Sequence, residues 1–423
     1  MNSKYTLCAT VVLWLGVAAL AHAQAAPVGV PQRHPLVFPI GIAASAVQPL
    51  VSLEYVVDVG PAVPVAAVAF SPDGKTLAVG GYQEVLLWDL QGAKLAKRAG
   101  VGQLTDVVRA LAFRKDGRFL VVGEGSPRGS PGMKILDLQS GQPAASFPDP
   151  TDVVSLGLSP DGKLAAVGGT DNLVRVWNLD DKKLQTAMKE HGARVSGVAF
   201  SADGKFLATA GADRALRIWE VGTWKLLATM EQTEAVHAAA FNPDGSLLAV
   251  AVGGPDDRAI HIRRRDNSQE VRVLDTAQGL PLDIFWAAQG NRIYAACSDK
   301  TVKVFDANGG LVLNLSGHDD WVYCVALSPD GTKLASGSAD GTVKLWNAAD
   351  GRLLATFVQL SPRTDQWLIA TPPGYLATST AGALGWRPKN LKTTTDKFAT
   401  LLQNADLLRQ TIAGVKTAAP AVQ

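Results

Sequence analysis

The sequence predicts an all-β fold, a β-propeller, because one turn phrase recurs at a nearly constant interval. The phrase first appears as SPDG, ending at Gly74, and similar phrases end at Gly117, Gly162, Gly204, Gly245, Gly290, Gly331 and Gly374. Successive glycines of this set are 41 to 45 residues apart. A period of about 40–45 residues with four short strands in each unit is typical of propeller blades.

The unit from Val322 to Phe357 shows the strand pattern within one period. It reads VYCVALS, KLASGS, TVKLWN and RLLATF, and each junction is a turn that contains Asp followed by Gly. Short apolar runs separated by Asp-Gly turns indicate β-hairpins. No helical period interrupts residues 51–387, so this whole stretch is predicted to be the propeller.

The number of blades follows from counting the turn phrases. They define eight sets of three strands, and every set except the eighth is followed by a fourth strand. A spare strand, VSLEYVVDV at 51–59, precedes the first set. We therefore expect eight blades, in which the N-terminal strand pairs with the last three strands, because a closed ring leaves no sheet edge exposed. The alternative is seven blades, with 51–59 joined to the Gly331 unit and 358–387 as a C-terminal appendage.

The N-terminal 23 residues are expected to be a secretory signal peptide. Lys4 precedes an apolar run from Tyr5 to Leu20, and Ala21-His22-Ala23 is a small-x-small cleavage site. The run is shorter than the roughly 20 residues that span a bilayer. We expect an exported protein, periplasmic or extracellular, with no membrane span after cleavage and with a Pro/Ala-rich linker at 24–50.

Residues 388–423 are expected to form one helix and a tail. Thr395 or Asp396 can cap the start of this helix, and Gly414 can end it. The apolar residues that recur at helical spacing are Phe398, Leu401, Leu402, Leu408 and Ile412.

Charge and cysteine content exclude several classes of protein. The net charge is +2, and removal of residues 1–23 takes away Lys4 and no acid, which leaves +1. A nearly neutral chain predicts no electrostatic attraction to nucleic acid or to anionic membranes. Cys297 and Cys324 lie on apolar strands, where we expect two buried thiols. A disulfide is the alternative, and it would require the two Cα atoms to lie within about 7 Å.

Two units place the same four polar residue types at matching offsets. A His precedes the first strand, a Ser or Thr lies on the second, an Asp follows in the next turn, and a Trp ends the third strand. A buried Asp needs hydrogen-bond donors, and the other three side chains can supply them in a chain. In WD-repeat propellers, which these units resemble, such a set forms a hydrogen-bonded network that supports a blade. The resemblance implies two structural tetrads here: His318, Ser336, Asp340 and Trp346 in one unit, and His191, Thr209, Asp213 and Trp219 in the other.

The tetrads and the turn phrase resemble those of WD-repeat propellers, and the resemblance covers residues 51 to about 387. It implies a ring whose face at the start of the first strands binds protein partners. A narrower similarity, in GKTLAVGGYQEVLLWDL and the loop GEGSPRGSPG, is to propeller modules of secreted planctomycete-type proteins often joined to a cytochrome c domain. No CxxCH occurs in the chain, which excludes a covalent c-type haem.

Other units depart from the tetrad pattern. Trp88 has no matching Asp, and Asp299 is followed at the Trp offset by Phe305. Asp257 is followed at that offset by Arg263, which suggests an Asp–Arg pair in place of the tetrad. These units are expected to depend more on apolar packing.

Catalytic signatures are absent from the sequence. The patterns GxSxG, HExxH and CxxC and the phosphate loop do not occur. We therefore expect a protein without enzyme activity, cofactor or metal.

The eighth residue before each turn glycine falls where a first strand begins. These seven positions are predicted to form an interaction face at one end of the ring. They are Ala66, Arg109, Val154, Ser196, His237, Leu282 and Tyr323, and Arg194 and Trp321 lie beside them. Trp, Tyr and Arg dominate the energetics of protein interfaces. The set lacks the two groups of general acid–base catalysis and the ligands of a metal site.

The favoured function is accordingly a secreted scaffold that binds an unidentified protein partner through this face. The alternatives are a hydrolase or lactonase that uses the central channel, and an accessory subunit of an envelope redox assembly. The last alternative depends only on the cytochrome-linked similarity. For each single residue of the face, the simpler interpretation is a rim position without a functional role.

Overall fold

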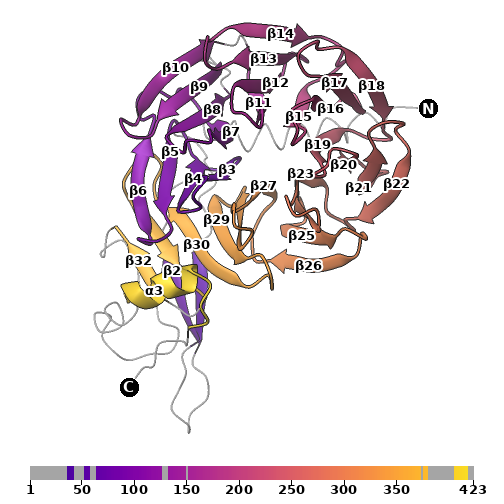
Figure 1. The fold of residues 1–423 in the computed structure, drawn as a ribbon. Helices are drawn as coiled ribbons and strands as arrows, with labels where there is room; N and C mark the ends of the chain where they lie inside the picture. The colour runs from indigo at the N-terminus through magenta and orange to yellow at the C-terminus, as the bar shows by residue number, and fades with distance from the viewer. Residues whose placement is uncertain are drawn as a thin grey trace, which may run out of the picture.

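Seven antiparallel sheets surround a central channel in the computed structural model, in the manner of propeller blades (Figure 1). The structure describes residues 36–41, 52–57, 63–125, 132–148, 151–372, 375–379 and 404–417. In each blade, consecutive strands pair in chain order, the first strand next to the channel and the fourth at the circumference. The predicted all-β propeller is confirmed.

Each blade begins with four short strands. Blades 1 and 2 contain β3 (Val68–Phe70), β4 (Thr76–Gly80), β5 (Val85–Asp89), β6 (Lys94–Ala99), β7 (Val108–Phe113), β8 (Phe119–Glu124), β9 (Gly132–Asp137) and β10 (Gln142–Pro148). Blades 3 and 4 contain β11 (Val153–Leu158), β12 (Leu164–Gly169), β13 (Val174–Asn178), β14 (Leu184–Met188), β15 (Val195–Phe200), β16 (Phe206–Gly211), β17 (Ala215–Glu220) and β18 (Leu226–Glu231). Blades 5 and 6 contain β19 (Val236–Phe241), β20 (Leu247–Gly253), β21 (Arg258–Arg264), β22 (Glu270–Asp275), β23 (Pro281–Trp286), β24 (Arg292–Cys297), β25 (Thr301–Asp306) and β26 (Leu311–Ser316). Blade 7 contains β27 (Val322–Leu327), β28 (Lys333–Ser338), β29 (Thr342–Asn347), β30 (Leu353–Gln359), β31 (Trp367–Ala370) and β32 (Leu376–Thr378).

The recurring turn phrase joins the first and second strands of each blade, and its residues have distinct roles. In blade 1, the Ser71 hydroxyl donates to Asp73 Oδ1 at 2.6 Å and accepts the amide of Thr76 at 2.9 Å. Gly74 closes the turn with a φ of +69°, and the equivalent glycines of the other six blades have φ between +67° and +74°. This left-handed conformation costs a residue with a Cβ atom free energy, which is why glycine recurs there.

The expectation of eight blades is wrong, and the seven-blade alternative is the observed fold. The last predicted set does not start a new blade, because β31 pairs with β30 and β32 pairs with β31, which extends blade 7 to six strands. The spare N-terminal strand, β2 (Ser52–Val57), pairs with β1 (Leu36–Gly41) outside the ring (Figure 1). It therefore joins neither the last strands nor the Gly331 unit, and β1 lies within the segment expected to be a linker.

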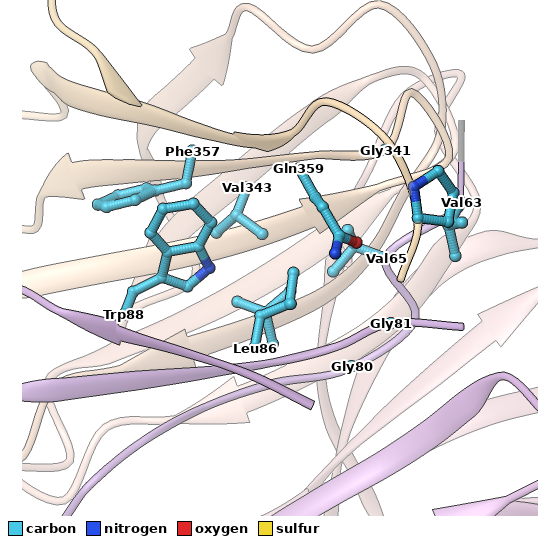
Figure 2. A pocket seen from close by; sticks show the side chains of 12 residues that line it. Val63, Val65, Gly80, Gly81, Leu86, Trp88, Gly341, Val343, Phe357 and Gln359 are labelled. Atoms are coloured by element: carbon cyan, nitrogen blue, oxygen red, sulfur yellow. The ribbon is translucent and has the colours of Figure 1, made fainter. Parts of the chain in front are cut away.

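The ring closes between blades 1 and 7 without sharing a strand among the described residues. The Val65 amide donates to the Ser338 carbonyl at 2.9 Å, and a Cβ atom added at Gly337 would lie 2.6 Å from Val65 Cγ1. Trp88 packs edge-on against Phe357, with ring centroids 5.1 Å apart. This seam is thus an apolar contact between two complete sheets (Figure 2).

A buried carboxylate ties blade 1 to the extension of blade 7. The side chain of Glu84 is fully buried, and it accepts bonds from Arg98 Nε at 2.5 Å, Gln359 Nε2 at 2.8 Å and the Arg363 amide at 2.8 Å. These donors come from both sides of the seam. The Glu84 side chain therefore links blade 1 directly to the extension of blade 7.

Glu84→Gln should lower the free energy of unfolding by about 2 kcal/mol, because an uncharged amide forms weaker bonds to Arg98 and turns a donor toward other donors. Equilibrium urea denaturation measures this change. Asp365→Asn is the matched control, since this carboxylate also pairs with Arg98 but is 86% exposed, and it should cost under about 0.5 kcal/mol. Equal effects of the two substitutions would contradict the role given to Glu84.

The C-terminal helix α3 (Ala405–Ile412) covers part of the seam. The Asn404 side chain caps it by accepting the Leu407 amide, and Gly414, with φ +96°, follows its end as predicted. Leu408 and Ile412 are buried in the same cluster as Trp88. The expected caps Thr395 and Asp396 and the apolar positions Phe398, Leu401 and Leu402 lie outside the described residues.

Candidate functional site

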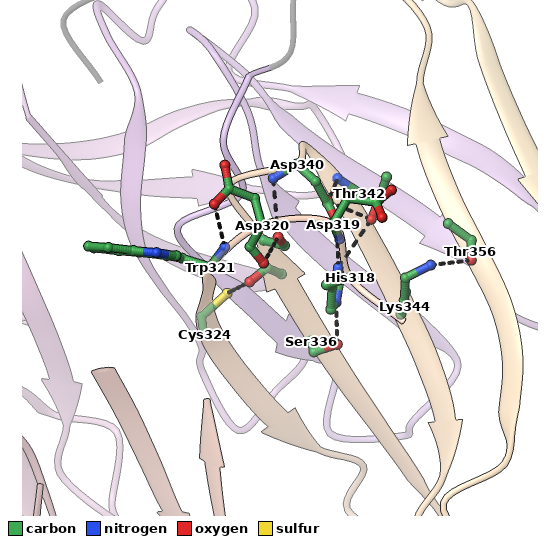
Figure 3. A network of polar contacts seen from close by, with 12 residues as sticks. His318, Asp319, Asp320, Trp321, Cys324, Ser336, Asp340, Thr342, Lys344 and Thr356 are labelled. Carbon is green, nitrogen blue, oxygen red and sulfur yellow. Dashed lines mark hydrogen bonds and ion pairs between the residues drawn. The ribbon is translucent and has the colours of Figure 1, made fainter. Parts of the chain in front are cut away.

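The blade 7 tetrad forms one continuous hydrogen-bonded chain, and Figure 3 shows its part from Ser336 through His318 to Asp340. Trp346 Nε1 donates to Ser336 Oγ at 2.9 Å, Ser336 Oγ lies 2.8 Å from His318 Nε2, and His318 Nδ1 lies 2.9 Å from Asp340 Oδ2. The ionised Asp340 carboxylate can only accept, so His318 Nδ1 carries a proton and donates to it, and the Ser336 hydroxyl accepts the indole N–H. The four side chains lie together between β27, β28 and β29 and stabilise the blade.

The blade 4 tetrad repeats this geometry. Trp219 Nε1 donates to Thr209 Oγ1 at 2.9 Å, Thr209 Oγ1 lies 2.8 Å from His191 Nε2, and His191 Nδ1 lies 3.0 Å from Asp213 Oδ1. Arg217 adds an ion pair to Asp213 at 2.7 Å. Burial lowers the pKa of His191 more than the neighbouring carboxylate raises it, so this imidazole is neutral at pH 7.

The Asp340 carboxylate is ionised despite its burial. Burial alone would raise its pKa, but bonds from His318, Thr342 and the Asp319 amide outweigh burial and hold the pKa well below its usual range. The Thr342 hydroxyl donates to Oδ1 at 2.7 Å, and the Asp319 amide donates to Oδ2 at 2.9 Å. A carboxylate that accepts this many bonds serves to hold the loop before β27 and the turn before β29 together.

Blades 3 and 6 lack a full tetrad but have an ion pair like that of Asp213 and Arg217 in blade 4. The turn Asp binds a cation four residues later on the third strand. These pairs are Asp171 with Arg175 at 2.6 Å in blade 3, and Asp299 with Lys303 in blade 6.

Blade 5 corrects one expectation from the sequence. Asp257 does not pair with Arg263 but with His261, whose Nε2 lies 3.0 Å from Oδ2. Arg263 instead pairs with Glu270 at 3.1 Å. Alternation places residues 257, 261 and 263 on one face of the strand, so His261 lies between the other two and pairs with Asp257, while Arg263, two residues further along, pairs with Glu270.

The residues of the predicted interaction face line the wall of the central channel. The channel encloses about 790 Å³, and Arg109, Ser196, His237, Leu282 and Tyr323 are among its lining residues, as are Ala66 and Val154. In blades 2 to 7 each of these residues lies at a register shift between the first and second strands, such as that between Val236 and Ala238. A bulge leaves one residue unpaired and redirects its side chain, so the repeat aims one side chain per blade at the channel.

Arg194 and Trp321 lie two residues before Ser196 and Tyr323, next to the channel lining. The Trp321 amide donates to Asp320 Oδ1 at 2.8 Å, and the indole points away from the tetrad (Figure 3). Burial, followed by the charge of Asp320, raises the pKa of Tyr323 to about 12. The tyrosine is therefore a neutral donor at the channel wall.

Several polar atoms of this face are buried and have no hydrogen-bond partner among the residues that the structure describes. They are Arg109 Nε, Arg194 Nε and Ser196 Oγ. Arg109 Nη2 lies 3.4 Å from Asp152 Oδ2. His237 Nε2 lies 3.2 Å from the Gly253 carbonyl, and burial together with the charge of Arg194 lowers the pKa of His237 to about 4.

The structure adds one channel residue that the sequence argument missed. Asp283 follows Leu282 and lines the channel, and its Oδ2 accepts the Val325 amide at 3.0 Å. Burial raises its pKa to about 6. The corresponding residues of blades 2 to 5 and 7 are Ala110, Ser155, Gly197, Ala238 and Cys324, and an acid among such small residues was a signal that could have been found in the repeat.

The two cysteines of the propeller are not joined by a disulfide. Cys297 and Cys324 are separate buried thiols, and burial raises the pKa of Cys297 to about 12.

No group of three His, Cys, Asp or Glu side chains that could hold a metal ion occurs within the described residues. None of their helices is long and apolar enough to cross a bilayer, and the expected signal peptide at 1–23 and the centre of the glycine-rich loop at 126–131 lie outside them.

Comparisons with known proteins agree with the ring. The model of the WD domain, G-beta repeat, matches residues 56–89, 141–178, 182–220 and 309–347, and the last two stretches contain the tetrads. Protein FIZZY-RELATED 3 of Arabidopsis thaliana is 24% identical over 294 residues, which are 69% of this chain and 51% of that protein. The serine-threonine kinase receptor-associated protein of Rattus norvegicus is 25% identical over 244 residues, 56% of this chain and 67% of that protein.

The chain thus spans about half the length of the first of these relatives. The fold, the tetrads and the matched stretches all reflect the same sequence repeat. The chain therefore folds as a seven-bladed β-propeller, and four stretches of it match the WD repeat.

Proposed function

We propose that the protein is an exported, non-enzymatic scaffold that binds a protein partner at the channel face formed by Arg109, Arg194, Ser196, His237, Leu282, Trp321 and Tyr323. The observation that carries the proposal is the bulge in the first strand of six blades, which directs one side chain per blade into a single channel. Aromatic and arginine side chains gathered at a concave surface are the usual anchors of a protein interface.

Other features support the same proposal. The name of the serine-threonine kinase receptor-associated protein describes association with another protein, and such association is what we propose for this chain. The charged start, apolar run and small-x-small site of residues 1–23 support export. The similarity to propeller modules of secreted bacterial proteins supports a place in a bacterial cell envelope.

Replacing Arg109, Trp321 and Tyr323 together with alanine should abolish capture of the partner and leave the fold intact. Affinity purification from the organism that encodes the protein, with mass spectrometry, measures capture, and circular dichroism checks the fold. The matched control replaces three exposed lysines next to the turns at the opposite ends of first strands: Lys75, Lys163 and Lys205. Equal capture by the face variant and the wild type would refute the proposal.

A second candidate is a hydrolase that uses the channel, because the perturbed Asp283 and His237 both line it. A carboxyl whose pKa is near 6 can act as a general acid or base at neutral pH. A screen of the purified protein against ester and lactone substrates, repeated with Asp283→Asn, tests this candidate. Turnover that Asp283→Asn abolishes would favour the hydrolase over the scaffold.

A further inference from the structure

The two arginines of the channel face and the neutral imidazole of His237 lie on one side of the ring. Arg109 belongs to blade 2, Arg194 precedes the first strand of blade 4, and His237 belongs to blade 5. The opposite side, blades 6 and 7, presents Leu282 and Tyr323. The channel face therefore has a basic arc, formed by Arg109 and Arg194, across from Leu282 and Tyr323, and Asp283 lies next to Leu282.

Arg194 is the least satisfied member of the basic arc. Its Nε is buried without a hydrogen-bond partner, and within the described part of the chain no carboxylate lies at ion-pair distance from it. Burial, and after it the charge of Arg109, lowers the pKa of Arg194. Arg194 is half-buried, and its Nε is fully buried. A guanidinium partly withdrawn from water without a counter-charge is destabilising, and an anion at this place would reduce the cost.

The side-chain groups near Arg194 are hydrogen-bond donors, which bind an anion rather than a cation. Arg109 Nε and Ser196 Oγ are two further buried donors without partners. Asp152 offsets part of the charge of Arg109 from 3.4 Å. The other carboxylate of the channel, Asp283, is on the blade 6 side and is bonded to the Val325 amide, so it does not neutralise Arg194.

We propose that Arg194, with Arg109 and the Ser196 hydroxyl, binds a carboxylate that an acidic segment of the protein partner inserts into the channel. The proposal rests on the scaffold function above and specifies its partner chemistry. A guanidinium fork binds a carboxylate with two parallel hydrogen bonds. Leu282 and Tyr323, across the channel, leave room for the side chains that flank the acid in the partner segment.

Titration of the purified protein with a blocked acidic peptide tests the proposal. The peptide is acetyl-Gly-Asp-Glu-Asp-Gly-amide, the comparison peptide has Asn and Gln in place of the acids, and calorimetry measures binding. Wild type should bind the acidic peptide saturably, and Arg194→Gln should bind it at least about tenfold more weakly, the loss expected for charge-assisted hydrogen bonds. Arg264→Gln, at an exposed arginine on β21, is the matched control and should bind as wild type does.

A second measurement keeps the test valid if Arg194→Gln folds poorly. The charge of Arg194 lowers the pKa of His237, so a bound carboxylate should raise that pKa, which the imidazole proton resonances report in the wild type. Arg194→Lys keeps the charge but loses the fork, and it should bind the acidic peptide with intermediate affinity. Equal binding of both peptides, or no change at His237 during saturable binding, would overturn the proposal.

Three further outcomes bear on this proposal, and the last two separate it from the scaffold function. If inorganic phosphate binds at Arg194 and the acidic peptide does not, the carboxylate assignment is wrong. If the partner is captured equally by wild type and by Arg194→Gln, the carboxylate site is wrong and the scaffold stands. If the acidic peptide binds through Arg194 but the face variant captures the same proteins as wild type, the site stands and the scaffold function is wrong.

Discussion

Trp88→Ala is expected to lower the free energy of unfolding by about 4 kcal/mol, the range measured for removal of a large buried aromatic side chain. The indole is 1% exposed at the seam between blades 1 and 7, with ring centroids 5.1 Å from Phe357 and 5.9 Å from Trp367. No strand is shared across the seam among the described residues, so no ladder of backbone hydrogen bonds compensates for the lost packing. Equilibrium urea denaturation measures the change.

Trp88→Phe is the matched control for this prediction. Trp88 Nε1 is buried without a hydrogen-bond partner beside a cavity of about 20 Å³ (Figure 2), so loss of the indole N–H should cost little, about 1 kcal/mol for packing alone. Trp346→Phe should cost more, because its indole N–H donates to Ser336 Oγ and the tetrad would lose a donor. A larger cost for Trp88→Phe than for Trp346→Phe would contradict this account of the seam.

Asp340→Ala should destabilise the protein by about 3 kcal/mol. The substitution leaves the buried His318 imidazole and Thr342 hydroxyl, and the backbone amides of Asp319 and Thr342, without their acceptor. A buried donor left without an acceptor costs about 1–3 kcal/mol. Asp350→Ala is the control, because this carboxylate is half exposed and should cost under about 1 kcal/mol. Similar losses at the two positions, measured by urea denaturation, would refute the tetrad as a source of stability.

The same carboxylate predicts a pH dependence of stability. The folded protein holds the pKa of Asp340 below its unfolded value of about 3.9. Its contribution is therefore complete above pH 4 and is lost as the pH falls toward the folded pKa, since the unfolded chain takes up the proton first. The difference in unfolding free energy between wild type and Asp340→Asn should shrink from pH 7 to pH 2.5, and a constant difference would contradict the prediction.

The ring of sheets could be predicted from the sequence because its determinants are local. The turn phrase depends on a hydroxyl, an aspartate and a left-handed glycine such as Gly74, all within four residues. The tetrads could be proposed because fixed offsets within one blade bring His318 and Asp340 together. For the channel face, the repeat offset was sufficient to select residues such as His237, since each first strand begins with the same bulge.

The number of blades, the seam between blades 1 and 7 and the surroundings of Arg194 could not be predicted. Each depends on contacts between segments that are far apart in the chain. The strand at 367–370 has the sequence of a new blade, but it adds to the free edge of β30, and the N-terminal strand pairs with β1 instead. Strand pattern alone is equally compatible with either pairing, and the packing of the edges selects one. In the same way, an arginine is an ordinary surface residue in the sequence, and Arg194 becomes a candidate binding residue only where the closed ring partly buries it beside Arg109 with no carboxylate at ion-pair distance among the described residues.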